Sequence, residues 1–209
     1  MPGFFLSLEG VDGVGKTTQA QLLAEGLQRQ GRCVTTCRDP GGTVAGDRIR
    51  AILLDPELTL PPVAETFLFQ ASRSLLVAEV IRPALERDEV VITDRFLLST
   101  VVYQGHAGGL APAELWSMGR LATGGVLPGR TLVLDMPAAS AAQRGTRTAD
   151  RIEAKGLAYL ESVRQGFLAE ARAHADTMVV IDANRAVDAV AADVRREVAH
   201  VLGLDPRTP

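Results

Sequence analysis

Hydrophobic positions along the chain fall into short continuous runs that alternate with longer stretches in which apolar residues recur at helical spacing. Continuous apolar strands separated by helices are typical of a parallel sheet that is covered on both faces. We therefore predict one α/β domain over residues 1–209 with about five strands. The predicted strands are Phe4–Leu8, Arg32–Cys37, Val90–Thr93, Thr131–Leu134 and Thr177–Ile181.

The longer stretches predict helices between these strands. Pro83 lies inside the third helix, where it removes the hydrogen bond to residue 79, so we expect a kink there. The predicted helices are Thr17–Gln30, Val44–Leu54, Ala64–Arg87, Pro112–Thr123, Ala138–Gln143, Ala154–Ala175 and Val187–Leu202.

Composition narrows the class of protein. Among 209 residues, 46% are hydrophobic and 22% are charged, which suits a chain with a packed core and excludes disordered and collagen-like classes. The net charge of −3 argues against a nucleic-acid partner.

No run approaches the roughly 18 apolar residues of a membrane span, and the N-terminus lacks the positive region of a signal peptide. Cys33 and Cys37 lie roughly 13 Å apart along one predicted strand, too far to bridge. We expect a cytoplasmic protein with reduced thiols and no membrane partner.

The strongest motif fits GxxxxGK[ST] and lies between the first predicted strand and the first predicted helix, as a P-loop requires. Its glycines let backbone N–H groups turn toward one anion at a helix N-terminus. Lys16 can reach the β- and γ-phosphates of a nucleotide, and the Thr17 hydroxyl can ligate Mg²⁺. The motif predicts binding of a nucleoside triphosphate. Its residues are Gly10, Val11, Asp12, Gly13, Val14, Gly15, Lys16 and Thr17, followed by Thr18.

A P-loop alone does not separate a kinase from an ATPase or a GTP switch. The Asn-Lys-x-Asp motif of a switch is absent from the sequence, whereas a second anion site is indicated. Asp94 and Arg95 close the strand Val90–Thr93, at the edge where parallel sheets bind ligands. Asp94 can orient Mg²⁺ or its waters, and Arg95 can hold an acceptor phosphate. Asp135, after the strand Thr131–Leu134, is a rival Mg²⁺ candidate.

Three further residue patterns are weaker evidence for ligand binding than the P-loop, because each also has an ordinary structural explanation. Phe69 and Arg73 are four residues apart on one helical face and could stack and bond a base, although core packing is the usual role of a helical Phe. Thr100 and Gln104 share the same spacing beside Tyr103. Arg144, Arg147 and Arg151 would share one helical face; the poor helix formers between them predict a movable lid over about residues 143–151, unless the face is merely solvated.

Together these residues resemble the thymidylate kinase (dTMP kinase) family over essentially the whole chain. The resemblance implies a five-stranded P-loop nucleoside monophosphate kinase fold, a homodimer, and transfer of the ATP γ-phosphate to dTMP with Mg²⁺. Gly13 stands where eukaryotic relatives carry an arginine, so the chain resembles the bacterial type, whose lid supplies that charge. The matching segments are residues 8–18, 38–43, 67–73, 94–96, 99–105 and 150–153.

The resemblance also implies roles for single residues. Thr17 and Asp94 would hold the metal, Arg144 would cover adenine, and Arg147 would be the lid's catalytic arginine. The implied catalytic residues are Lys16, Arg95, Arg147 and Asp12. On the acceptor side, Asp12 would approach the 3′-hydroxyl, Arg95 and Arg38 the phosphate, Phe69 and Arg73 the thymine, Tyr103 the 2′ position, and Thr100 and Gln104 the base edge.

Two residues depart from the family pattern. Asp39 replaces the usual Glu of the Arg-Glu-Pro-Gly-Gly-Thr motif, and Phe96 replaces the Tyr or His that commonly follows Asp-Arg. The shorter acid moves its carboxylate by roughly an ångström, so we assign Asp39 no role. The alternative functions are another nucleoside monophosphate or deoxynucleoside kinase, and a nucleotide-binding regulator without turnover.

Overall fold

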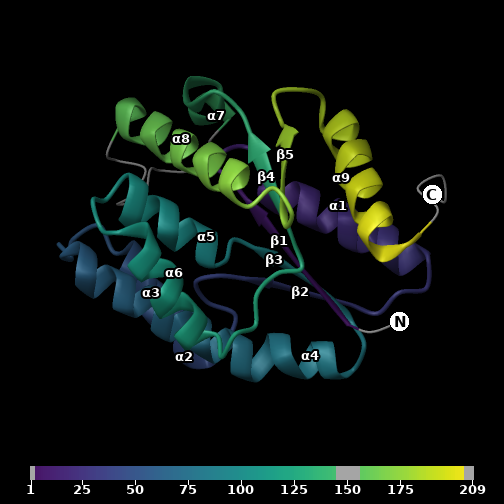
Figure 1. Ribbon diagram of the computed structural model, residues 1–209, viewed down its shortest axis with the longest axis horizontal. Coiled ribbons are helices and arrows are strands. Elements are labelled where there is room, and N and C mark those ends of the chain that lie inside the picture. The colour runs from purple at the N-terminus through teal and green to yellow at the C-terminus, as the bar shows by residue number, and fades with distance from the viewer. Residues whose placement is uncertain (1–2, 145–155, 205–209) are drawn as a thin grey trace.

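The computed structural model describes residues 3–144 and 156–204 and contains a five-stranded sheet in the order β2-β3-β1-β4-β5 (Figure 1). All pairings between its strands are parallel. Each predicted strand is confirmed to within two residues at either end, and the predicted α/β class is confirmed with them. The strands are β1 (Phe4–Glu9), β2 (Val34–Arg38), β3 (Val90–Asp94), β4 (Arg130–Asp135) and β5 (Met178–Asp182).

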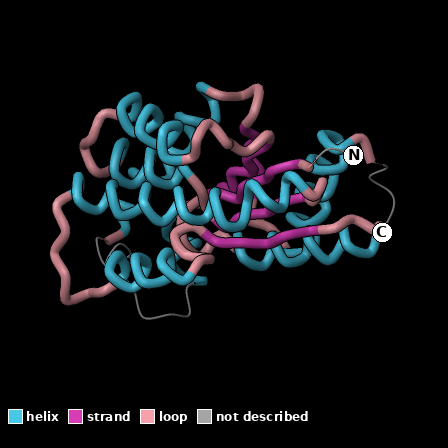
Figure 2. Tube along the Cα trace, turned by 90° about the horizontal axis from the view of Figure 1, so that it is seen from below, coloured by secondary structure: helices cyan, strands magenta, loops and turns pink. Residues whose placement is uncertain are grey.

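Helices cover both faces of this sheet (Figures 1 and 2). On one face α1 (Lys16–Arg29) packs beside α9 (Val187–Leu202), although the two are far apart in sequence. On the other face α4 (Arg82–Glu86) packs on β3, and α8 (Leu157–Ala173) packs on β4 and β5. The sheet is therefore buried on both sides, which explains why its strands read as continuous apolar runs.

The long helix predicted over residues 64–87 is broken into three pieces. It consists of α3 (Pro62–Leu76), the π-helical turn η1 (Val77–Ile81) and α4, which begins just before Pro83. Proline has no amide hydrogen to give to residue 79, and the wider turn accommodates the missing bond. The π-helical turn therefore lies just before Pro83, at the position where we expect a kink.

A second π-helical turn, η2 (Val101–His106), continues from α5 (Leu97–Thr100). Residues 97–106 are not among the predicted helices, although the helical spacing of Thr100 and Gln104 agrees with this segment. Packing against α6 (Pro112–Ala122) and α8 holds this segment helical. The remaining helices are α2 (Val44–Leu54) and α7 (Ala138–Arg144).

Phe96 belongs to the core rather than to the cleft. Its side chain is buried, and its ring meets Phe5 edge-to-face with centroids 4.9 Å apart. The apolar ring that departs from the family pattern thus packs in the core. A second cluster of buried side chains joins β1 and β4 to α1, α8 and α9.

Two expectations from composition can be compared with the structure. Cys33 is exposed and Cys37 is partly buried, and both are free thiols, as predicted. Within the part of the chain that the structure describes, no helix has the length and apolar character needed to cross a membrane.

Candidate active site

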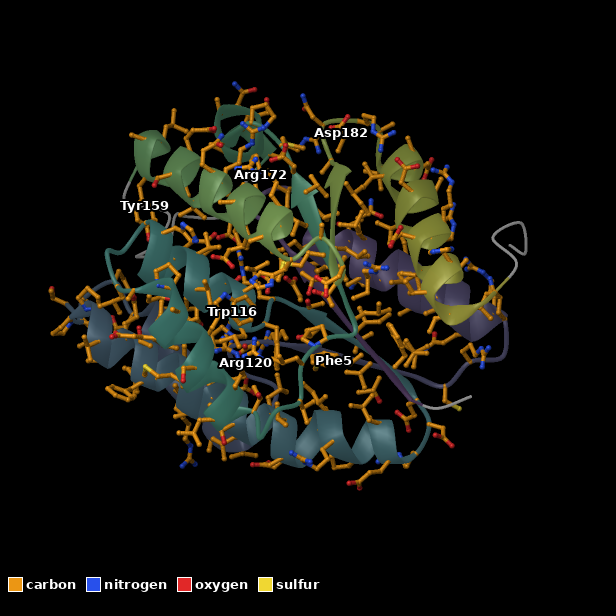
Figure 3. All side chains as sticks on the ribbon, in the orientation of Figure 1. Phe5, Trp116, Arg120, Tyr159, Arg172 and Asp182 are labelled. Carbon is orange, nitrogen blue, oxygen red and sulfur yellow. The ribbon has the colours of Figure 1, made fainter. Side chains whose placement is uncertain are left out.

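The sheet order brings the carboxyl ends of β1, β2 and β3 to one edge. Leu8 of β1 and Arg38 of β2 both pair with Asp94 of β3. A cleft of about 890 Å³ opens at this edge, and the P-loop and the β2 and β3 ends line it. Asp182, labelled in Figure 3, marks the same edge at the end of β5. Segments that are far apart in sequence therefore meet in one cleft.

The P-loop adopts backbone conformations that favour glycine. Gly10, Gly13 and Gly15 have φ values of 135°, 85° and 97°. A Cβ on Gly13 would lie 2.1 Å from the carbonyl oxygen of Ala141, so no side chain fits there without moving α7. The P-loop therefore has no room at position 13 for the arginine of eukaryotic relatives.

Lys16 folds its side chain back over this loop. Its Nζ donates to the carbonyl oxygens of Gly10 at 3.1 Å and Val11 at 2.9 Å. Burial lowers the pKa of Lys16, and the charge of Arg95 lowers it further. The ammonium group thus occupies the loop that would surround a phosphate.

Thr17 and Asp94 place two oxygens together in the cleft. The Thr17 hydroxyl donates to Oδ2 of Asp94 at 2.5 Å. Hydroxyl and carboxylate oxygens are ligands that suit Mg²⁺, so this pair fits the metal that accompanies a nucleoside triphosphate. The rival candidate Asp135 instead accepts two bonds from Arg164, at 2.7 and 2.9 Å. The geometry favours Asp94 over Asp135.

Arg95 has an uncommon backbone, with φ 69°, in the left-handed region. Its Nη1 donates to the Gly10 carbonyl and to Ser99 Oγ, both at 2.9 Å, and its Nη2 donates to Asp12 Oδ1 at 2.5 Å. Burial alone would raise the pKa of Asp12, but the charges of Arg95 and Lys16 outweigh it and hold that pKa well below its usual range. Arg95 and the P-loop thus form one charged unit.

Tyr103 closes the other side of this unit. Its ring lies under the Arg95 guanidinium, 5.2 Å from ring centroid to Cζ, and its hydroxyl accepts from Nη2 at 3.2 Å. Burial raises the pKa of Tyr103, which keeps the phenol neutral. Tyr159 of α8, labelled in Figure 3, donates to the Tyr103 carbonyl at 3.2 Å and ties α8 to η2.

Glu9 is a buried acid to which we assigned no role from the sequence. Its Oε1 accepts from the Phe96 amide at 2.8 Å and its Oε2 from the Ser99 hydroxyl at 2.6 Å. Burial raises the pKa of Glu9 to about 7, although the Ser99 bond and the charge of Arg95 oppose this. The available signal was a charged residue that ends an otherwise apolar strand.

Arg73 lies behind the cleft, almost wholly buried. Its Nε donates to Asp39 Oδ2 at 2.5 Å, its Nη1 to Gln70 at 2.8 Å and its Nη2 to Thr100 at 2.9 Å. Burial raises the pKa of Asp39, and the charge of Arg73 opposes that shift. The shortened acid of the motif is thus the partner of Arg73.

Of the other predicted residues that the structure describes, Arg38 and Arg144 line the cleft, whereas Phe69 and Gln104 are not among its lining residues. Phe69 is partly buried and packs against the core, and Gln104 is buried and donates to Glu65 at 3.0 Å. Arg38 is exposed beside Asp47. Arg144 lines the cleft and donates to the Ala183 carbonyl at 3.2 Å. Arg147 and Arg151 lie outside the described residues.

Arg50 also lines the cleft and donates to the Pro40 carbonyl at 2.9 Å. We did not single it out, because one arginine in a helical pattern reads as a solvated surface residue. The structure shows what the sequence pattern does not: α2 points this side chain back toward the end of β2.

Comparisons with known proteins agree with this geometry. The family model for thymidylate kinase matches residues 8–194. A thymidylate kinase from Bifidobacterium longum is 45% identical over 202 residues, which cover 95% of this chain and 98% of that protein. One from Symbiobacterium thermophilum is 46% identical over 200 residues, covering 95% and 94%. The crystal structure of thymidylate kinase from Ehrlichia chaffeensis superposes with a TM-score of 0.75 at 28% identity, covering 95% of this chain and 99% of that one.

Proposed function

We propose, from the premise that the chain belongs to the thymidylate kinase family, that the cleft at the sheet edge holds the reacting ends of both substrates. The enzyme phosphorylates dTMP to dTDP with ATP and Mg²⁺, as predicted from the sequence. The observation that carries the assignment is the continuity of one cleft from Lys16 and Thr17 past Arg95 to Arg38. A donor phosphate and an acceptor phosphate can meet only in such a shared space.

On the donor side, the P-loop amides from Gly10 to Thr18 surround the ATP phosphates. Lys16 turns its ammonium group from the loop carbonyls to the β- and γ-phosphate oxygens. Thr17 and Asp94 hold Mg²⁺, which when bound neutralises phosphate charge. Arg144, which lines the same cleft as Thr17, covers the adenine.

On the acceptor side, Arg95 and Arg38 hold the dTMP phosphate through charge-assisted bonds. Asp12 stays ionised because its pKa is low, so it accepts a bond from the 3′-hydroxyl of the sugar. Tyr103 fills the space beside the 2′ position, where a ribose hydroxyl would clash. These groups orient the acceptor before transfer.

The base lies on Phe69, with Arg73, Thr100 and Gln104 at its polar edge. Phe69→Ala tests this placement: loss of stacking should raise the KM for dTMP about ten- to hundredfold and leave the KM for ATP nearly unchanged. Thermal unfolding should be measured on the same variant. A large drop in Tm with normal dTMP kinetics would make Phe69 a core residue only.

We also propose that residues 1–209 form one domain with a lid over about residues 143–151, most of which lie outside the described part. The lid's Arg147 meets the charge that develops on the transferred phosphoryl group, because the P-loop has no room for an arginine at Gly13. The free thiols Cys33 and Cys37 suit the cytoplasm, where we place the enzyme. Cell fractionation of the native host tests this location.

We also propose that the chain acts as a homodimer through a face that includes α3 and α6, which pack together. On α3, Val63 and Phe67 lie one turn apart with 52% and 59% of their surface exposed, and Leu121 of α6 is 85% exposed. A second copy of the chain would cover these apolar side chains. Light scattering should find a dimer, and Phe67→Glu should give monomers, whereas Val180→Glu on the edge strand β5 should not. A monomeric wild type would refute the dimer.

A further inference from the structure

Two buried amide side chains lie between α3 and η2 with one end bonded and the other end without a partner among the described residues. Gln104 is 2% exposed and Gln70 is 6% exposed. The unpartnered atoms are the oxygen Oε1 of Gln104 and the nitrogen Nε2 of Gln70. A buried polar atom without a partner is costly, so each needs an explanation. One atom is an acceptor and the other is a donor.

Charged neighbours dictate which end of each amide remains open. Gln104 Nε2 donates to Oε2 of Glu65 at 3.0 Å. A carboxylate only accepts hydrogen bonds, so the amide must present its NH₂ group to Glu65 and turn its oxygen away. Arg73 has the opposite effect on Gln70. A guanidinium nitrogen can only donate, and Nη1 of Arg73 donates to the oxygen of Gln70 at 2.8 Å. Gln70 therefore keeps its NH₂ group for another partner.

The two unpartnered atoms, one acceptor and one donor, together have the polarity that an imide edge requires. Thymine presents a donor at N3–H flanked by carbonyl acceptors, whereas cytosine presents an acceptor at N3 beside an amino donor. We propose that Glu65 is a positioning residue that fixes the Gln104 amide so that the base site accepts an imide edge and rejects a cytosine-type edge. Arg73 fixes the Gln70 amide in the opposite way, by bonding its oxygen and leaving its NH₂ group to donate. The proposal rests on the proposed placement of the base beside Phe69.

In this arrangement Glu65 influences base selection through Gln104, without contacting the base itself. A cytosine edge would put its N3 acceptor against the Gln104 oxygen and leave buried groups unpaired. Sites that depend on a hydrogen bond can reject the wrong partner by about 10⁴-fold or more. A free amide, in contrast, could rotate by 180° and serve either edge. Glu65 removes that freedom.

The test uses dTMP and 5-methyl-dCMP, which share the sugar, phosphate and 5-methyl group and differ only at this edge. In Glu65→Gln the new side chain can donate or accept, so the Gln104 amide is no longer held in one orientation. The ratio of kcat/KM for dTMP to that for 5-methyl-dCMP should fall at least about tenfold, with the KM for ATP unchanged. An unchanged ratio overturns the proposal.

Thr66→Val is the matched control, because Thr66 is similarly buried on the same turn of α3 but its hydroxyl donates to the Pro62 carbonyl rather than to Gln104. It should lower stability without changing the ratio, and an equal fall in this control also overturns the proposal. If Glu65→Gln does not fold, the charge-conserving double variant Glu65→Gln/Gln104→Glu replaces it. That pair again presents only an acceptor to the base and should keep the wild-type ratio; a fall of tenfold or more contradicts the proposal.

The placement of the base is tested separately. If Phe69→Ala leaves the KM for dTMP unchanged, the proposed base site fails. If Phe69→Ala raises that KM but Glu65→Gln weakens both nucleotides equally, the site stands and only the role of Glu65 is refuted.

Discussion

Asp39 and Arg73 form an ion pair in which neither side chain reaches solvent. Nε of Arg73 donates to Oδ2 of Asp39 at 2.5 Å, and the two side chains are 1% and 0% exposed. The pair joins the end of β2 to α3, and through Gln70 and Thr100 it extends to the proposed base site. Removing two charges from water is costly, so each depends on the other.

Asp39→Asn should therefore be strongly destabilising, because it leaves the Arg73 charge buried without its partner. We expect a loss of about 3–5 kcal/mol in the free energy of unfolding, measured by urea denaturation. Asp47→Asn is the control: Asp47 pairs with Arg38 at 3.3 Å on the surface, and its loss should change stability little. Equal midpoints for both variants would contradict the buried pair.

Glu9 should give stability a pH dependence of its own. Its pKa rises from 4.5 to about 7 on folding, so the folded state binds the proton more tightly than the unfolded chain. The stability of the wild type relative to Glu9→Gln should fall as pH rises from about 4.5 to 7, by about 3 kcal/mol in total, and then level off. Urea titrations of both proteins from pH 4 to 8 measure this difference. A difference that rises with pH would show that the Glu9 pKa is not raised.

Tyr103 should exclude ribonucleotides by its bulk. Tyr103→Phe keeps the ring and should retain most of the preference for dTMP over ribothymidine monophosphate, although it loses the bond from Arg95. Tyr103→Ala should relax the preference, because the clash with a 2′-hydroxyl disappears. Competition kinetics with the two nucleotides decide this. Equal turnover of both by the wild type would remove the basis of the prediction.

Arg147 should contribute to the phosphoryl-transfer step rather than to substrate binding. A finger arginine is worth about 10³–10⁵ in rate in phosphoryl transfer. Arg147→Ala should therefore lower kcat at least about a hundredfold with modest changes in KM, because the contact forms mainly in the transition state. Single-turnover kinetics separate this step from product release. A near-normal kcat would remove Arg147 from the catalytic set.

Arg144→Ala provides the comparison within the same lid. Arg144 donates to the Ala183 carbonyl at the cleft, and if it covers adenine its loss should mainly raise the KM for ATP. A collapse of kcat in Arg144→Ala, with Arg147→Ala nearly normal, would exchange the two roles.

The strands could be predicted from the sequence because a sheet that is buried on both faces leaves a continuous apolar run in each strand. The P-loop was equally clear, since its glycines and Lys16 have fixed spacing. Asp39 was not, because its partner Arg73 lies 34 residues away and only the packing of α3 against the end of β2 brings them together. Glu9 was missed for the same reason: its two partners, Phe96 and Ser99, follow a different strand.

The π-helical turn η2 has a consequence for how this enzyme can evolve. A π-helical turn contains about one residue more than an α-helical turn. This one includes both Tyr103 and Gln104. A substitution within it changes one side chain and keeps the turn, whereas the loss of a single residue would restore an α-helical turn and rotate each later side chain by about 100°. Sugar and base recognition would then be lost in one step. Neutral drift in this segment should therefore proceed by replacement of residues and hardly ever by insertion or deletion.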